Sequence, residues 1–289
     1  MTPGVLQAEA RRWLAQGRRA VEVQILAHRG SVPREAGTRM VVAEDAVLGT
    51  VGGGHLEWRA LAAARDLLRR PHPPDAPTEL DLPLGPALGQ CCGGRVVLRL
   101  QTLSEASLAD WPMPAPRFFL QLHGAGHVGR AIVKLLGDID CRVQWIDERE
   151  GEFPPLSPPL AGAEPPHIER VCVDTPEAEV AQAPPGAFFL VMTHRHDLDE
   201  RITEAVLRRD DAGFCGLIGS ATKRARFAQR LAARGLPDAA LARLTCPIGL
   251  AGVTGKEPAV LALAVVAQLL CCAPLESPPH RRPRRTTTR

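Results

Sequence analysis

The sequence predicts an α/β protein whose C-terminal part is a doubly wound parallel sheet, preceded by a smaller α+β domain. Three observations lead to this fold class. Continuous apolar runs alternate with helical stretches from residue 117 onward, which is typical of strands buried on both faces of a parallel sheet. A proline-rich segment at residues 111–116 separates this pattern from the preceding one. The length of 289 residues also exceeds the usual size of one domain.

Residues 1–110 are predicted to form the α+β domain. Helices are expected at residues 5–17 and 56–70. Strands are expected at residues 21–27, 39–42, shortly after 77, and 95–103. The loops between these elements are rich in glycine at residues 30–34, 49–57 and 89–94. Such runs let a backbone approach a ligand or another backbone closely.

Residues 117–272 are predicted to form the doubly wound domain. Its strands are expected at residues 118–123, 142–147, 170–173, 188–193, 214–218 and 245–248. Helices are expected to follow Val128, Pro176, Asp197, Thr222 and Glu257. Ligands of such folds bind beyond the carboxyl ends of the strands. Residues 273–289 carry a cluster of arginines between prolines and are predicted to be a disordered basic tail.

Charge and hydropathy argue against several classes of protein function. The net charge of +3 lies largely in the basic tail, so the folded body is close to neutral and offers no obvious surface for nucleic acid. The longest apolar run, residues 258–272, is shorter than the roughly 20 residues of a membrane span. The N-terminal segment lacks the apolar core of a secretion signal. We therefore expect a cytoplasmic protein without a nucleic-acid or membrane partner.

The eight cysteines are expected to be reduced thiols. They include two adjacent pairs and no CxxC spacing, which disfavours a zinc site, and no metal ligand is assigned. Five lie within or beside apolar runs and are predicted to be buried: Cys141, Cys172, Cys215, Cys271 and Cys272. Cys92, between Cys91 and two glycines, is instead expected to be an exposed and reactive thiol, with an ordinary turn cysteine as the alternative.

The sharpest motif is Gly124-Ala125-Gly126-His127-Val128-Gly129, which follows a predicted strand and opens a helix. Asp147 ends the next strand, 18 residues beyond Gly129. This spacing is near the roughly 20 residues expected for an acid that binds a ribose. The combination predicts a Rossmann-like domain that binds a phosphate at the helix N-terminus. A glycine turn without a ligand is the alternative.

Two further strand ends carry candidate binding residues. The first holds His194, His196 and Asp197, for which helix capping is the alternative, with Asp197 as a plausible N-cap. The second holds Gly219, Ser220 and Lys223, where a basic first turn opposes the helix macrodipole. Anion binding explains that placement, and a solvated basic face is the alternative.

Eight ordered stretches of this chain resemble the XdhC/CoxI family of accessory proteins for molybdenum hydroxylases, in its xanthine dehydrogenase branch. The stretches are GSVPREAGTRMVV (30–42), GTVGGGHLE (49–57), GQCCGG (89–94), HGAGHVGRA (123–131), WIDERE (145–150), VMTHRHDLDE (191–200), GLIGSATKRARFAQRL (216–231) and CPIGLAGVTGKEPA (246–259). One departure is His55, where the broader family often has cysteine.

The resemblance implies a chaperone that binds the molybdenum cofactor, a molybdopterin, and protects its terminal sulfur ligand. It also implies insertion of the cofactor into apo-xanthine dehydrogenase and contact with a cysteine desulfurase. A homodimer is a further expectation. The crevice residues above, together with Gln90 and Cys92, are then the expected cofactor contacts, and no residue is assigned a catalytic role. The main alternative is an NAD(P)-dependent oxidoreductase that uses the GxGxxG motif. A third reading is a scaffold that binds no small ligand.

Overall fold

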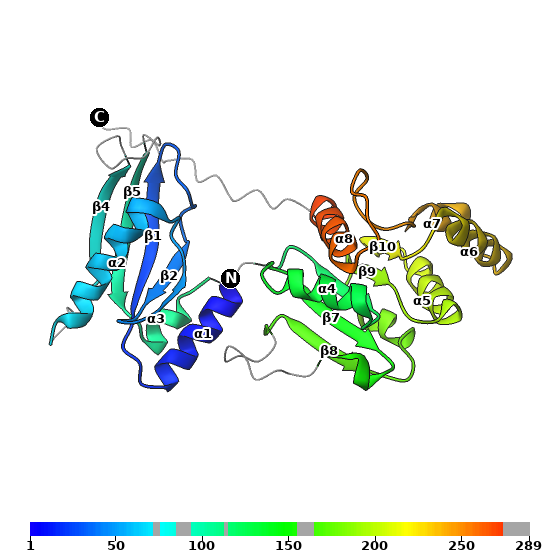
Figure 1. Cartoon of the computed structure of the whole chain (residues 1–289), viewed down its shortest axis with the longest axis horizontal. Coiled ribbons are helices and arrows are strands. Elements are labelled where there is room, and N and C mark those ends of the chain that lie inside the picture. Colours follow the sequence, from blue (N-terminus) through cyan, green and yellow to red (C-terminus); the bar gives the residue numbers. More distant parts are fainter. Residues whose placement is uncertain (72–75, 85–93, 113–114, 155–164, 274–289) are drawn as a thin grey trace, which may run out of the picture. The chain divides into compact units, whose positions relative to one another are not determined.

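A computed structural model describes residues 1–71, 76–84, 94–112, 115–154 and 165–273 of the chain (Figure 1). The chain divides into two compact units, Met1–Pro114 and Ala115–Arg289. The division falls within the proline-rich segment 111–116. Most of the expected basic tail, residues 274–289, lies outside the described residues.

The N-terminal unit is built on an antiparallel sheet of five strands in the order β3-β2-β1-β5-β4. The strands are β1 (Val21–Arg29), β2 (Arg39–Val42), β3 (Val47–Gly49), β4 (Thr78–Leu84) and β5 (Gly94–Thr102). Three helices accompany them: α1 (Pro3–Ala15), α2 (Gly54–Arg69) and α3 (Glu105–Ala109). Sequence analysis missed β3 and α3, which are too short to show a periodic apolar pattern.

Alternation of side chains along the strands gives this unit two small cores. Met40 and Val42 pack with Leu56 and other residues of α2, whereas Val41 between them packs with Leu6 of α1. Successive residues of a strand point to opposite faces of a sheet. Helix α2 therefore covers one face of the sheet, and α1 covers the other.

The C-terminal unit holds six parallel strands in the order β11-β10-β9-β6-β7-β8. They are β6 (Phe119–His123), β7 (Arg142–Asp147), β8 (Ile168–Cys172), β9 (Phe188–Val191), β10 (Phe214–Leu217) and β11 (Leu244–Thr245). The chain runs outward from β6 to β8 and then returns to the other side of β6 as β9. This reversal is the arrangement of a doubly wound Rossmann sheet, so the predicted fold class is confirmed.

Helices cover both faces of the parallel sheet. One core contains residues of α4 (His127–Leu136) and α8 (Pro258–Cys272), which lie together in Figure 1. The other contains residues of α5 (His196–Arg208), α6 (Ala221–Ala233) and the 3-10 helix η3 (Ala178–Gln182). A helix α7 (Asp238–Ala242) and a 3-10 helix η2 (Glu150–Glu152) complete the unit. The central strands β6, β9 and β10 are thus buried on both sides.

Two predicted elements are shorter in the structure than expected. The helix expected after Pro176 is only the 3-10 helix η3, because Pro184 and Pro185 leave too few residues for an α-helix before β9. The last strand ends at Thr245 rather than at residue 248, because Pro247 has no amide to donate to a ladder.

The cysteines are only partly placed as predicted. Cys141 and Cys215 are buried, and burial raises the pKa of each thiol to about 12. The prediction of burial is wrong for Cys172, Cys271 and Cys272, which are exposed. Cys172 ends the edge strand β8, and the other two end α8, where fewer neighbours cover the side chain. Of the helices in the described segments, none has the length and apolarity needed to cross a bilayer.

Candidate functional site

The candidate site lies where three neighbouring strands of the parallel sheet end. Strands β6, β9 and β10 are consecutive in the sheet order, and each is followed by a short loop and a helix, α4, α5 and α6 respectively. Because the carboxyl ends of parallel strands meet at one edge, the N-termini of these three helices gather there. The order of strands reverses between β6 and β9, so this edge holds the switch point of the fold.

The glycine motif after β6 contains two glycines needed for packing. Gly124 has a φ of +126°, and a Cβ atom there would lie 2.4 Å from the carbonyl oxygen of Met192. A Cβ atom on Gly129 would lie 2.2 Å from the carbonyl oxygen of Gly124. These glycines therefore let the loop approach the end of β9 and let α4 approach the loop.

Gly126 has a different role, because no atom of the described residues outside its own chain neighbours and helix lies within 4 Å of the position of its Cβ atom. It precedes the first residue of α4, His127, whose side chain is exposed. The amides of Gly126, His127 and Val128 find no hydrogen-bond acceptor in the described part of the chain. The first turn of α4 also carries no acidic residue. This helix end is open and can receive an anion.

Asp147 holds the glycine loop in place. Its side chain is 4% exposed, and Oδ2 accepts a hydrogen bond of 2.7 Å from the Ala125 amide. Arg149 donates to both carboxylate oxygens at 3.0 and 3.1 Å. Burial alone would raise the pKa of Asp147, but hydrogen bonds from Arg149 and Ala125 outweigh it and leave that pKa below its ordinary value. The carboxylate expected to bind a ribose is thus engaged within the protein.

The strand end at β9 brings the predicted histidines to the same edge. His194 Nε2 lies 3.5 Å from Oε1 of Glu148, the residue after Asp147, and Arg195 NH1 lies 3.5 Å from the same oxygen. The side chain of His196 is 85% exposed. The loops after β7 and β9 are therefore linked through a glutamate that sequence analysis did not single out.

Asp197 does not cap α5, contrary to one expectation. The helix begins at His196, so Arg195 occupies the N-cap position and Asp197 is the second helical residue. The Asp197 carboxylate instead pairs with Arg195 and with Arg201, the latter at 3.0 Å. Hydrogen bonds from Arg195 hold the pKa of Asp197 well below its ordinary value. Asp197 is therefore a surface ion-pair residue here.

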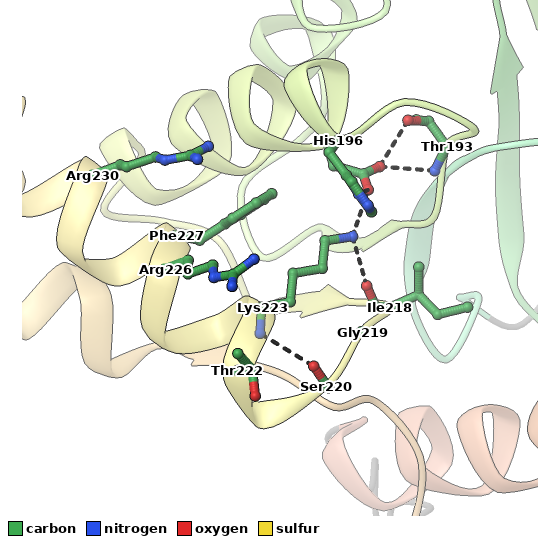
Figure 2. A pocket seen from close by; sticks show the side chains of 11 residues that line it. Thr193, His196, Ile218, Gly219, Ser220, Thr222, Lys223, Arg226, Phe227 and Arg230 are labelled. Atoms are coloured by element: carbon green, nitrogen blue, oxygen red, sulfur yellow. Dashed lines mark hydrogen bonds and ion pairs between the residues drawn. The ribbon is translucent and has the colours of Figure 1, made fainter.

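A pocket of about 520 Å³ lies between the first turns of α5 and α6 (Figure 2). Four residues predicted as binding residues line it: His196, Gly219, Ser220 and Lys223. Ser220 caps α6, since its hydroxyl accepts a hydrogen bond of 3.2 Å from the Lys223 amide. Gly219 leaves room for the lysine, because a Cβ atom there would lie 2.5 Å from Lys223 Cδ. A volume of this size suits a small-molecule ligand.

Lys223 has a partner that sequence analysis did not predict. Its Nζ donates to Oδ2 of Asp199 at 2.7 Å and to the carbonyl oxygen of Ile218 at 2.9 Å (Figure 2). Asp199 is 1% exposed and accepts two further hydrogen bonds from Thr193, through the amide and the hydroxyl. The positive charge of Lys223 is therefore balanced inside the protein. The only signal for Asp199 was an acidic residue in the first turn of α5.

Among the described residues that line this pocket, Arg226 is the arginine without an ion pair. Arg230, one turn later on α6, pairs with the buried Glu200 at 2.8 Å. Arg226 is exposed and makes no hydrogen bond or ion pair with any described residue. The pocket therefore carries a guanidinium that no described residue balances, which is a setting for an anionic ligand.

The structure thus brings part of the predicted site together. Residues from the ends of β6, β7, β9 and β10 lie at one edge of one sheet. Gln90 and Cys92 lie outside the described residues, so their relation to this edge stays a prediction.

Known proteins resemble this chain in sequence and fold. The model of the XdhC Rossmann domain matches residues 120–269, and that of the XdhC and CoxI family matches residues 13–74. YqeB of Escherichia coli K12, an uncharacterized protein, is 29% identical over 253 residues, which is 86% of this chain and 42% of YqeB. The chain thus spans less than half the length of that relative.

A crystal structure described as a xanthine dehydrogenase from Bacillus halodurans is similar in fold. Its TM-score is 0.69 at 19% identity, and the match covers 94% of this chain and 96% of that one. At this identity the likeness concerns the fold. The Rossmann-domain model alone spans more than half of the sequence and contains the whole edge described above. The chain belongs to the XdhC and CoxI family.

Proposed function

We propose that this protein holds the molybdenum cofactor at the strand-end edge of its C-terminal unit and delivers it to an apo-hydroxylase of the xanthine dehydrogenase type. One observation carries the proposal. At its strand-end edge, the XdhC Rossmann domain of this chain carries amides at the start of α4 and the guanidinium of Arg226 on α6. None of these groups has a partner among the described residues. The cofactor is here a transferred cargo and not a resident group.

The chemistry of the cargo fits the groups at this edge. Molybdopterin carries a phosphate, a polar pterin and a dithiolene that binds the metal. The amides of Gly126, His127 and Val128 suit the phosphate, because a helix N-terminus favours an anion and these donors lack acceptors among the described residues. The open space at Gly126 lets the phosphate approach the backbone. The nearby His194, His196 and Ser220 offer polar groups for the pterin.

The competing function is that of an NAD(P)-dependent oxidoreductase. A dinucleotide would need a free carboxylate at the end of β7 for its ribose. Asp147 fills that position, but its oxygens already accept hydrogen bonds from Ala125 and Arg149. This engagement supports a carrier over a dehydrogenase, and we propose that the protein has no turnover of its own.

The partners that this role requires are proposals as well. They are an apo-hydroxylase that receives the cofactor and a cysteine desulfurase that supplies its terminal sulfur. A homodimer is a separate proposal, which this role does not require. Cys92 is proposed as a thiol used in cofactor handling, because a thiolate suits a soft molybdenum centre. We expect Cys92→Ser to lower maturation of the hydroxylase while the variant folds normally.

Reconstitution tests the proposed function directly. Apo-xanthine dehydrogenase, molybdenum cofactor and this protein are mixed, and hydroxylase activity is followed. Wild-type protein is expected to raise the yield of active enzyme, and Gly126→Val to give no increase, because its side chain occupies the space where the phosphate would approach. Equal yields with and without the wild-type protein, or steady oxidation of NAD(P)H by the protein alone, would contradict the proposal.

A further inference from the structure

The N-terminal unit contains a second pocket, separate from the strand-end edge of the C-terminal unit. Its volume is about 480 Å³, and it is formed by the start of α1, the loop between β1 and β2, the end of β3 and the segment after α3. Two of the glycine-rich loops noted in the sequence contribute to its wall: Arg34 comes from residues 30–34, and Gly49 and Thr50 come from residues 49–57. Nothing in the proposed carrier function uses this pocket.

One side of the pocket is apolar and is formed by residues of a packed core. Leu6 and Trp111 line it, and both belong to the small core on the α1 face of the sheet. Arg39 lies with its guanidinium 5.3 Å from the centre of the Trp111 ring, and its Nε donates to Glu22 at 2.9 Å. Because Glu22 is only 1% exposed, the charge of Arg39 is balanced by a buried carboxylate. These contacts hold the indole in one position.

A second arginine, Arg34, lies on the pocket wall. Arg34 is exposed and makes no hydrogen bond or ion pair with the residues that the structure describes. No aspartate or glutamate is among the described residues that line the pocket. A free guanidinium therefore stands at an apolar pocket with no carboxylate to balance it. A guanidinium binds carboxylate, sulfonate or phosphate oxygens through paired hydrogen bonds.

Trp111 adds an unused donor. Its side chain is 6% exposed, and its indole N–H has no acceptor within the described segments. A buried donor without an acceptor costs free energy, and an acceptor atom on a ligand is a partner that these residues do not supply.

We infer that this pocket binds a small organic anion, with an apolar or aromatic body against Leu6 and Trp111 and a single acidic group on Arg34. The volume lies in the range of sites for small molecules. Apolar walls with one convergent charge are typical of sites that select such amphiphilic ligands. The inference does not depend on the molybdenum cofactor or on the strand-end edge.

Two fluorescent probes of similar shape test the inference on the full-length protein. 1-Anilinonaphthalene-8-sulfonate carries a sulfonate, and N-phenyl-1-naphthylamine is its uncharged analogue. We expect one sulfonate probe to bind per chain. Arg34→Gln should weaken binding of the sulfonate probe about tenfold, the equivalent of one charge-assisted hydrogen bond. Binding of the uncharged probe should stay unchanged. Arg11→Gln is the matched control, because Arg11 is exposed on α1 and does not line the pocket.

A blocking variant separates this pocket from other sites on the protein. Ala36 is exposed and lines the pocket, so Ala36→Phe should abolish binding of both probes. Ala62→Phe, at an exposed position of α2, should bind both as the wild type does. Binding that survives Ala36→Phe, equal loss of both probes in Arg34→Gln, or no binding by the wild type would overturn the inference.

Discussion

His123 is a buried histidine at the end of the central strand β6. Its side chain is 0% exposed, and neither ring nitrogen has a partner among the described residues. Burial disfavours the charged ring and lowers the pKa of His123 from 6.5 to about 3. The folded protein therefore holds this imidazole neutral over the whole physiological range of pH.

This burial predicts a pH-dependent stability. Between the unfolded pKa of 6.5 and the folded pKa of about 3, the unfolded chain binds the extra proton. The free energy of unfolding should thus fall as the pH falls through this window, by up to about 1.4 kcal/mol per pH unit. Urea denaturation at a series of pH values measures the slope. His123→Leu should flatten this slope, and His127→Gln, at an exposed position, should not. Equal slopes of unfolding free energy against pH for wild type and His123→Leu would rule the explanation out.

The pair of Lys223 and Asp199 predicts a second effect on stability. Lys223→Met leaves the Asp199 carboxylate buried without a cation, which should cost about 3 kcal/mol. The double variant Lys223→Met/Asp199→Asn removes both charges and should recover a large part of that loss. Lys256→Met, at an exposed position, serves as the control. Urea midpoints compare the four proteins, and a Lys223→Met variant as stable as wild type would show that the pair is not a structural link.

At the scale of elements, the glycines of the motif after β6 have separable effects. Gly129→Ala places a Cβ atom 2.2 Å from the carbonyl oxygen of Gly124, so helix and loop must move apart. We expect a loss of about 1–3 kcal/mol, typical of overpacking. Gly126→Ala meets no neighbour and should cost less than about 1 kcal/mol, the loss expected at an N-cap. Thermal unfolding followed by circular dichroism compares the two, and equal losses would contradict this assignment.

Elements with long apolar runs could be predicted from the sequence, and short ones could not. The runs that became β6, β9 and β10 lie close to their expected places, because strands buried on both faces need continuous apolar residues. The 3-10 helix η3 was expected to be an α-helix. The prolines that follow it limit the length of the helix but do not change the periodic pattern of apolar residues from which the helix was predicted.

The site was predictable only where a motif is local in sequence. The GxGxxG motif, the histidine segment and Lys223 could be placed at strand ends. The partners of these residues could not: Asp199 for Lys223, Glu148 for His194, and Ala125 for Asp147 are set by the packing of segments that are distant in sequence. That Arg226 has no partner among the described residues could be recognised only after Lys223 and Arg230 were found to be paired.

At the scale of the whole molecule, the structure adds the order of the strands in the parallel sheet. Sequence analysis predicted a doubly wound sheet, and the observed order places the ends of β6 and β9 at its switch point. Three helices begin at this edge, and only some of their polar groups are satisfied within the protein. Each of the two units thus contains, among its described residues, a pocket whose volume suits a small ligand.

Direct binding of the cargo tests the central claim. Protein is incubated with molybdenum cofactor, unbound cofactor is removed by ultrafiltration, and the retained pterin is oxidised and measured by fluorescence. The wild type and Ala232→Val, a control in the last turn of α6, should each retain one pterin per chain. Gly126→Val should bind at least about tenfold more weakly, because its side chain blocks the approach to the helix amides. Retention by Gly126→Val equal to that of the wild type, or a wild type that retains no pterin, would contradict the account.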